Sequence, residues 1–173
     1  MPSTYEGRFD LRGPNGTCYV AGGRGAAEVA LRERAGETLT SLGWLSGAWC
    51  DETAVSRLEA PFGGQLSNVT DPRASAYGVT REISTTTRYD ITQQWAVQLH
   101  ALGSHGIRYE PRFSTDVNAY SLALFGDAGV APFPDDLSPT SGRDAATAAG
   151  IAIVDLPKSG KLTFRSPPAR GTP

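Results

Sequence analysis

The hydrophobic and polar positions near the start of the chain follow first a strand pattern and then a helix pattern. Residues 17–21 are β-branched, aromatic or small, and glycines stand on both sides of them, which predicts a short strand. Residues 25–35 are rich in alanine, leucine, glutamate and arginine, and Gly36 follows, which predicts a helix that ends there. The chain therefore begins with a predicted loop, strand, turn and helix.

A second helical pattern lies in the middle of the chain. Asp90 precedes Gln93 by three residues, which is a capping-box-like signal with aspartate in place of serine or threonine. Apolar residues then recur at helical spacing before a glycine, at Ile91, Trp95, Leu99 and Leu102. This pattern predicts an amphipathic helix, capped by Asp90, that buries Trp95.

Shorter apolar runs predict further strands at residues 54–58 and 119–125, and a last strand at residues 150–156. Between residues 131 and 149 the composition changes to proline, aspartate, serine, threonine and alanine. Proline excludes regular structure at the start of this stretch, so we expect a surface loop or a mobile flap. Residues 165–173 contain three prolines and little to bury, which predicts a frayed tail.

The size and charge of the chain narrow the classes of function. With 173 residues we expect one domain, over residues 1–164, that is large enough to bury a core. The 16 basic and 18 acidic residues give a net charge of −2 and form no long run of one sign, which disfavours binding to nucleic acid or to a membrane surface. No apolar run approaches the roughly 20 residues of a membrane span, and residues 1–7 do not resemble a signal peptide. We therefore expect a cytoplasmic protein.

The cysteines and histidines predict no metal site. Cys18 and Cys50 lack metal-ligand spacing, and in a reducing compartment we expect them to be free thiols, mainly buried and structural. His100 and His105 have no aspartate or cysteine partner at a suitable spacing, which favours structural roles for them as well.

Several segments together resemble the RES domain family, which is named for an arginine, a glutamate and a serine. The resemblance runs from Gly7 to Gly126, and a Gln-x-Trp-Ala helix core at residues 93–96 adds to it. The segments that carry it are GRFDL at 7–11, GTCYVA at 16–21, EVALRERAG at 28–36, GIRYEPRF at 106–113 and ALFG at 123–126. Each segment alone is a weak signal, and their order and intervals make the resemblance.

The resemblance implies an α+β fold of the ADP-ribosyltransferase-like type, with a split mixed β-sheet and packed helices. Family members are toxins of bacterial toxin–antitoxin pairs that consume NAD or transfer its ADP-ribose. It therefore implies NAD as the substrate, no metal, and a helix-turn-helix antitoxin that occludes the pocket and creates an oligomer. The acceptor of the ADP-ribose stays open between phosphate, water and a target protein.

The chemistry of NAD cleavage gives the candidate residues their roles. Breaking the bond between nicotinamide and ribose develops positive charge on the sugar, which a carboxylate stabilises. Glu33 is the candidate carboxylate and Glu28 the alternative, 14 and 9 residues after Tyr19. Arg8 offers a planar fork that matches a pyrophosphate, and Tyr19 offers an aromatic face for the cationic nicotinamide ring.

The third signature residue of the family is where this sequence departs from the pattern. Family members commonly carry a serine two residues after the tyrosine of the Gly-Ile-Arg-Tyr strand, and here Pro111 stands in that position after Tyr109. Ser114 is the nearest candidate to supply the hydroxyl, and Arg112 is a candidate to hold phosphate. The departure leaves an alternative open, namely a catalytically silent RES-like domain that serves as a nucleotide-binding or protein-interaction module.

Overall fold

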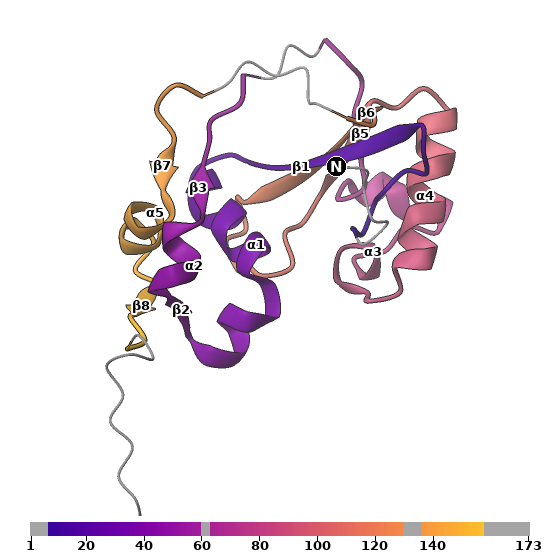
Figure 1. Ribbon diagram of the computed structural model, residues 1–173. Coiled ribbons are helices and arrows are strands. Elements are labelled where there is room, and N and C mark those ends of the chain that lie inside the picture. Colours follow the sequence, from indigo (N-terminus) through magenta and orange to yellow (C-terminus); the bar gives the residue numbers. More distant parts are fainter. Residues whose placement is uncertain (1–6, 60–62, 130–135, 158–173) are drawn as a thin grey trace, which may run out of the picture.

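The computed structural model describes residues 7–59, 63–129 and 136–157, and Figure 1 gives their arrangement. In chain order the elements are β1 (Asn15–Gly22), α1 (Ala26–Leu42), β2 (Trp44–Ser46), α2 (Gly47–Asp51), β3 (Ala54–Val55), β4 (Ser67–Asn68), η1 (Pro72–Tyr77), α3 (Glu82–Thr85), α4 (Tyr89–Ala101), β5 (Gly106–Tyr109), β6 (Tyr120–Asp127), β7 (Thr140–Ser141), α5 (Gly142–Ala148) and β8 (Ala152–Val154).

The main sheet has four strands in the order β1-β6-β5-β4. β6 pairs antiparallel with both β1 and β5, and β4 pairs parallel with β5. Two short pairs lie apart from this sheet, parallel β2–β8 and antiparallel β3–β7. The sheet is therefore mixed and is accompanied by helices, which confirms the predicted α+β class.

Helices gather at two ends of the molecule. In Figure 1, α3 and α4 lie at one end of the β1–β6 ribbon, and α1, α2 and α5 lie with the short strand pairs at the other end. Each end has its own core. The core under α4 includes Phe9, Leu11, Ile107, Tyr109, Ala123 and Phe125. The core between α1, α2 and α5 includes Leu31, Leu39, Leu45, Cys50, Ala145, Ala146 and Ile151.

The predicted strand at residues 17–21 is confirmed within β1, and the helix that follows it breaks where it was expected to end. Gly36 has φ 56° and ψ −135°, which are not helical angles. The chain kinks there, and a second helical stretch continues to Leu42 and buries Leu39. Gly43, with φ 73°, ends α1 in the left-handed conformation that glycine adopts without strain.

The prediction for α4 was wrong in its cap and only partly right in its buried face, where Trp95 and Leu99 pack against the core. The helix begins at Tyr89 after Arg88, and Asp90 lies in the first turn, where it pairs with Arg88 at 2.9 Å. Ile91 and Leu102 are exposed, and Trp95 is half-buried against the core. The buried positions of α4 are Thr92, Gln93 and Ala96. The helix turns its polar side inward because these side chains bind the backbone of the loop at Gly7 and Arg8.

The prediction of a loop from residue 131 to residue 149 was also wrong in its second half, where α5 forms. The prolines all precede Ser141, whose hydroxyl accepts a hydrogen bond from the Asp144 backbone N–H at 3.1 Å and caps the helix. Ala145 and Ala146 then pack in the core. Residues 130–135 and the predicted tail at 165–173 lie outside the described residues, as does the predicted domain boundary at 164.

The remaining expectations are confirmed in part. β3 covers only Ala54–Val55 of the strand predicted at residues 54–58, whereas β6 and β8 lie where strands were predicted. Cys18 and Cys50 are free thiols, Cys50 buried and Cys18 half-buried. None of the helices in the described residues has the length and apolar character needed to cross a membrane.

Ile91 on α4, compared with Ile107 in β5, tests which face of α4 is buried. Ile107 is 0% exposed in the core, and we expect Ile107→Ala to lower the free energy of unfolding by about 2 to 5 kcal/mol. Ile91 is 41% exposed, so Ile91→Ala should change it by no more than about 0.5 kcal/mol. Urea denaturation measures both. If Ile91→Ala lowers the free energy of unfolding as much as Ile107→Ala does, Ile91 is buried as the sequence pattern predicted, and the orientation of α4 described above is wrong.

Candidate functional site

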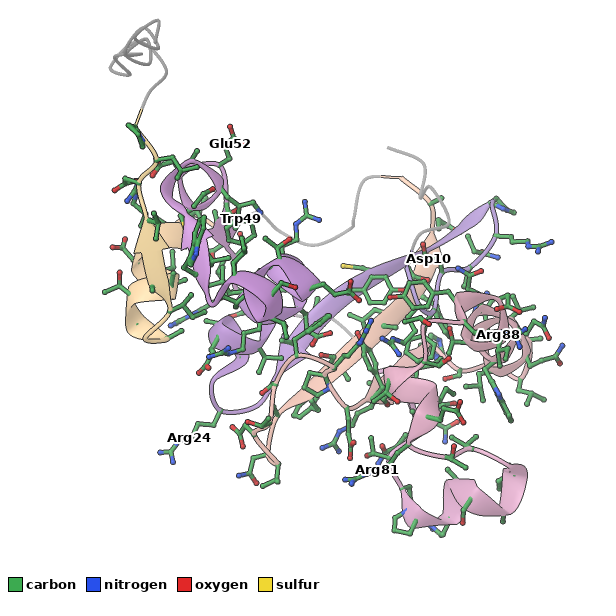
Figure 2. The ribbon with its side chains drawn as sticks, turned by 90° about the horizontal axis from the view of Figure 1, so that it is seen from below. Asp10, Arg24, Trp49, Glu52, Arg81 and Arg88 are labelled. Carbon is green, nitrogen blue, oxygen red and sulfur yellow. The ribbon has the colours of Figure 1, made fainter. Side chains whose placement is uncertain are left out.

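The segment before β1, residues 7–11, is held against the strand by two side chains of β1. The Tyr19 phenol accepts a hydrogen bond from the Phe9 backbone N–H at 2.7 Å and donates to Asp10 Oδ1 at 2.8 Å. The Thr17 hydroxyl donates to the Phe9 carbonyl at 2.9 Å and accepts from the Leu11 N–H at 3.2 Å. Figure 2 shows Asp10 close to β1. We call residues 7–11 the arginine loop.

Helix α4 holds the arginine loop from the other side. The Thr92 hydroxyl donates to the Arg8 carbonyl, and the Gln93 side-chain amide donates to the Gly7 carbonyl at 2.9 Å. The loop is therefore clamped between a strand and a helix. Its backbone groups are paired by side chains, as buried backbone outside regular structure requires.

The Arg8 side chain is buried, with 8% of its surface exposed, and it points toward α3. Its Nη1 donates to the carbonyls of Ile83 at 3.3 Å and Thr86 at 3.1 Å, at the C-terminal end of that helix. The guanidinium carbon lies 5.4 Å from the centre of the Tyr89 ring. Helix-end carbonyls and an aromatic face both stabilise a cation, so the position of Arg8 is favourable although it is buried.

Glu33 approaches the same region from α1. Its Oε1 accepts a hydrogen bond from the Phe113 backbone N–H at 2.7 Å. Burial raises the pKa of the Glu33 carboxyl, while this hydrogen bond and the positive charges of Arg8 and Arg112 act in the opposite direction. Phe113 lies in the loop after β5, so this hydrogen bond ties Glu33 of α1 to that loop.

Tyr109 connects these groups at the end of β5. Burial, and next the negative charge of Glu33, raise the pKa of its phenol, whereas a hydrogen bond with Ser121 and the charge of Arg8 lower it. Tyr109 and Ser121 are paired residues of β5 and β6, and they are 5% and 3% exposed. We call Arg8, Glu33, Tyr109 and Ser121 the tyrosine cluster.

The Tyr19 ring lies next to the tyrosine cluster and remains 40% exposed. Desolvation and the nearby Asp10 carboxylate raise the pKa of its phenol, and Tyr109 also contributes. Tyr19 is therefore a neutral hydrogen-bond donor at physiological pH. Its hydroxyl is fixed to the arginine loop, and part of its ring faces solvent.

Glu28 and Ser114, also proposed from the sequence, lie outside the tyrosine cluster, whereas the positive charge of Arg112 acts on Glu33 as that of Arg8 does. Glu28 pairs with Arg32 at 2.7 Å on the surface of α1. The Arg112 guanidinium pairs with Glu37 at 3.1 Å. The Ser114 hydroxyl accepts a hydrogen bond from the Asp116 N–H at 3.3 Å, and Ser114 lines a separate hollow of about 310 Å³.

Sequence reasoning missed Ser121 and gave Tyr109 no role. Ser121 is the polar residue of an otherwise apolar strand, YSLALF, and its neighbours Ala123 and Phe125 on the same face belong to the core. A hydroxyl at a core position requires a hydrogen-bond partner, which was the signal available in the sequence. The identity of that partner depends on the register between β5 and β6.

The described residues contain no group of three or more histidine, cysteine, aspartate or glutamate side chains arranged to hold a metal ion. Comparisons of the chain with protein-family models, with curated proteins and with solved structures find no match. The geometry of the site therefore carries the functional argument.

The Tyr19 hydroxyl provides a first test of the clamp. Tyr19→Phe removes the acceptor of the Phe9 N–H and a donor to Asp10, which is 5% exposed, so we expect a loss of about 1 to 3 kcal/mol in the free energy of unfolding. The matched control is Tyr77→Phe, because Tyr77 is 78% exposed. Equal stability of both variants in urea denaturation would mean that the hydroxyl does not hold the loop.

The burial of Glu33 predicts a pH-dependent stability. A carboxyl whose pKa is raised on folding stabilises the fold below its unfolded pKa, and this contribution is lost as the pH rises through the folded pKa. We therefore expect the wild type to lose stability relative to Glu33→Gln as the pH rises above the ordinary pKa of a glutamate. Thermal melts at a series of pH values measure the difference. Parallel curves for the two proteins would contradict the assignment.

Proposed function

We propose that the chain cleaves NAD at the bond between nicotinamide and ribose, as the RES family does. The observation that carries the proposal is that the arginine loop and α1 both contact the end of β5 and the loop after it. The Phe9 ring lies 4.9 Å from the Tyr109 ring, and Glu33 accepts a hydrogen bond from the Phe113 N–H at 2.7 Å. Glu33 is half-buried, and desolvation raises the pKa of its carboxyl; groups with such shifts cluster at functional sites.

The residues would divide the chemistry of bond cleavage between them. The Glu33 carboxylate would stabilise the positive charge that develops on the ribose, and Arg8 would face the pyrophosphate. The Tyr19 hydroxyl is fixed by Phe9 and Asp10, which holds its half-exposed ring ready to stack on nicotinamide. Residues fixed before the substrate arrives need no reordering in the transition state.

The tyrosine cluster also offers a hydroxyl where the family serine is missing. Ser121 is buried and pairs in register with Tyr109, whereas Ser114 lines a hollow beside α1. We therefore infer that Ser121, acting through Tyr109, supplies the polar contact that the family places after this strand. The finer assignments belong to the same proposal: an ADP-ribosyltransferase-like split sheet, a cytoplasmic toxin, an oligomer with a helix-turn-helix antitoxin, and phosphate, water or a protein as acceptor.

One observation favours the alternative of a catalytically silent nucleotide-binding or protein-interaction module. The Nη1 of Arg8 is occupied by the carbonyls of Ile83 and Thr86, and the Tyr19 hydroxyl is occupied by the arginine loop. Groups already bonded within the protein contribute less to a substrate. A silent module would keep the fold of the site and release no nicotinamide.

Release of nicotinamide from NAD separates the two functions. We expect the wild type to release it, with a rate that depends on phosphate if phosphate is the acceptor. Glu33→Gln keeps the size of the side chain and removes its charge, so turnover should fall on the order of 100-fold. Glu28→Gln is the matched control on the same helix and should retain wild-type turnover.

Thermal melts with NAD complete the test, because a ligand that binds only the folded state raises the melting temperature. A higher melting temperature without nicotinamide release would identify a silent nucleotide-binding module. If NAD changes neither quantity, the proposed function is wrong. Loss of turnover in Glu28→Gln instead of Glu33→Gln would transfer the catalytic role to Glu28.

A further inference from the structure

A hollow of about 1010 Å³ lies beside β1, on the side of α1. Its lining includes Tyr19, Val20 and Ala21 of β1 and every residue from 52 to 59. Side chains of a strand alternate between the two faces of the sheet. Because three consecutive residues of β1 line the hollow, the hollow must touch the backbone edge of β1 as well as one face of the strand. Figure 1 places β3 beside the first turns of α1, near the end of β1.

β1 is an edge strand of the main sheet, and its free edge carries unpaired backbone groups. The Phe125 N–H donates to the His105 carbonyl on the β5 side, and Phe125 pairs in register with Thr17. In an antiparallel ladder the direction of the backbone groups alternates from residue to residue. The N–H and C=O groups of Tyr19 and Ala21 therefore point away from β6, and no backbone group in the described residues pairs with them.

The helix wall and the floor of the hollow are mainly apolar, whereas the wall opposite carries Glu52, Arg57 and Glu59. Ala26, Ala27 and Ala30 of α1 provide a wall of small side chains, and Leu122 and Leu124 of β6 provide a floor. The opposite wall is anchored, since the Arg57 backbone N–H donates to Asp136 Oδ2 at 2.7 Å. Small residues on the helix leave space above the leucines that the protein itself does not fill.

We propose that this hollow binds an extended peptide segment of a partner protein, which adds to β1 as a further strand. Backbone donors and acceptors that recur at every second residue are satisfied together only by another extended backbone. The alternate side chains of such a segment would enter the hollow, and its apolar floor selects apolar ones. The hollow shares Tyr19 with the proposed NAD site, but the peptide would bind the backbone edge of β1 and its binding is measured without NAD, so the two proposals can fail separately.

The test uses a fluorescent seven-residue peptide that alternates valine and threonine, and measures its anisotropy as the protein is added. Two further peptides carry N-methyl groups, one on every valine and one on every threonine. In an added strand the N–H groups of alternate residues point toward β1, so either the valines or the threonines, but not both, donate to β1. We expect the unmethylated peptide to bind saturably, one methylated peptide to bind about tenfold or more weakly, and the other to bind like the unmethylated one.

Two protein variants locate the binding. Ala27 is exposed and lines the hollow, so Ala27→Phe should weaken the unmethylated peptide about tenfold or more. Ala48 is exposed on α2 and does not line it, so Ala48→Phe should bind like the wild type. The proposal is overturned if no saturable binding occurs up to about 1 mM peptide. Equal binding of both methylated peptides, or equal binding by both variants, overturns it as well.

Discussion

The structure depends on satisfying the backbone of the arginine loop, which is buried without being part of a sheet or helix. Buried N–H and C=O groups are costly when unpaired, so neighbouring elements must supply partners. Thr17 and Tyr19 supply them from β1, and Thr92 and Gln93 supply them from α4. This requirement fixes the distance between the strand and the helix, and it explains why α4 turns polar residues toward the core.

The same clamp determines the electrostatics of the candidate site. Once the loop is fixed, the Arg8 side chain is buried against the carbonyls of α3, and its charge acts on both Glu33 and Tyr109. Glu33 is in turn positioned by the Phe113 backbone N–H. The tyrosine cluster thus combines Arg8, from the loop beside α4, with Glu33, from α1 at the other end of the molecule. Neither end of the molecule alone provides both the positive and the negative charge.

Local patterns in the sequence predicted where strands and helices form better than they predicted which of their side chains are buried. The strand at residues 17–21 and the break at Gly36 depend on glycines and side-chain type, which are local properties. The buried face of α4 depends on hydrogen bonds from Thr92 to a segment far away in sequence, which periodicity does not encode. Arg8 and Glu33 were proposed from the family resemblance, whereas the pairing of Tyr109 with Ser121 required the register of β5 and β6.

The central claim is that the tyrosine cluster and the arginine loop form a nucleotide-binding site. The most direct measurement is a titration of the isotope-labelled protein with NAD, followed through its backbone amide signals. The amide of Phe113, which donates to Glu33, and the amide of Phe9, which donates to Tyr19, report on the two sides of the site. If NAD binds there, both signals shift saturably. Unchanged signals at about 10 mM NAD, where even millimolar affinity approaches saturation, would contradict this claim.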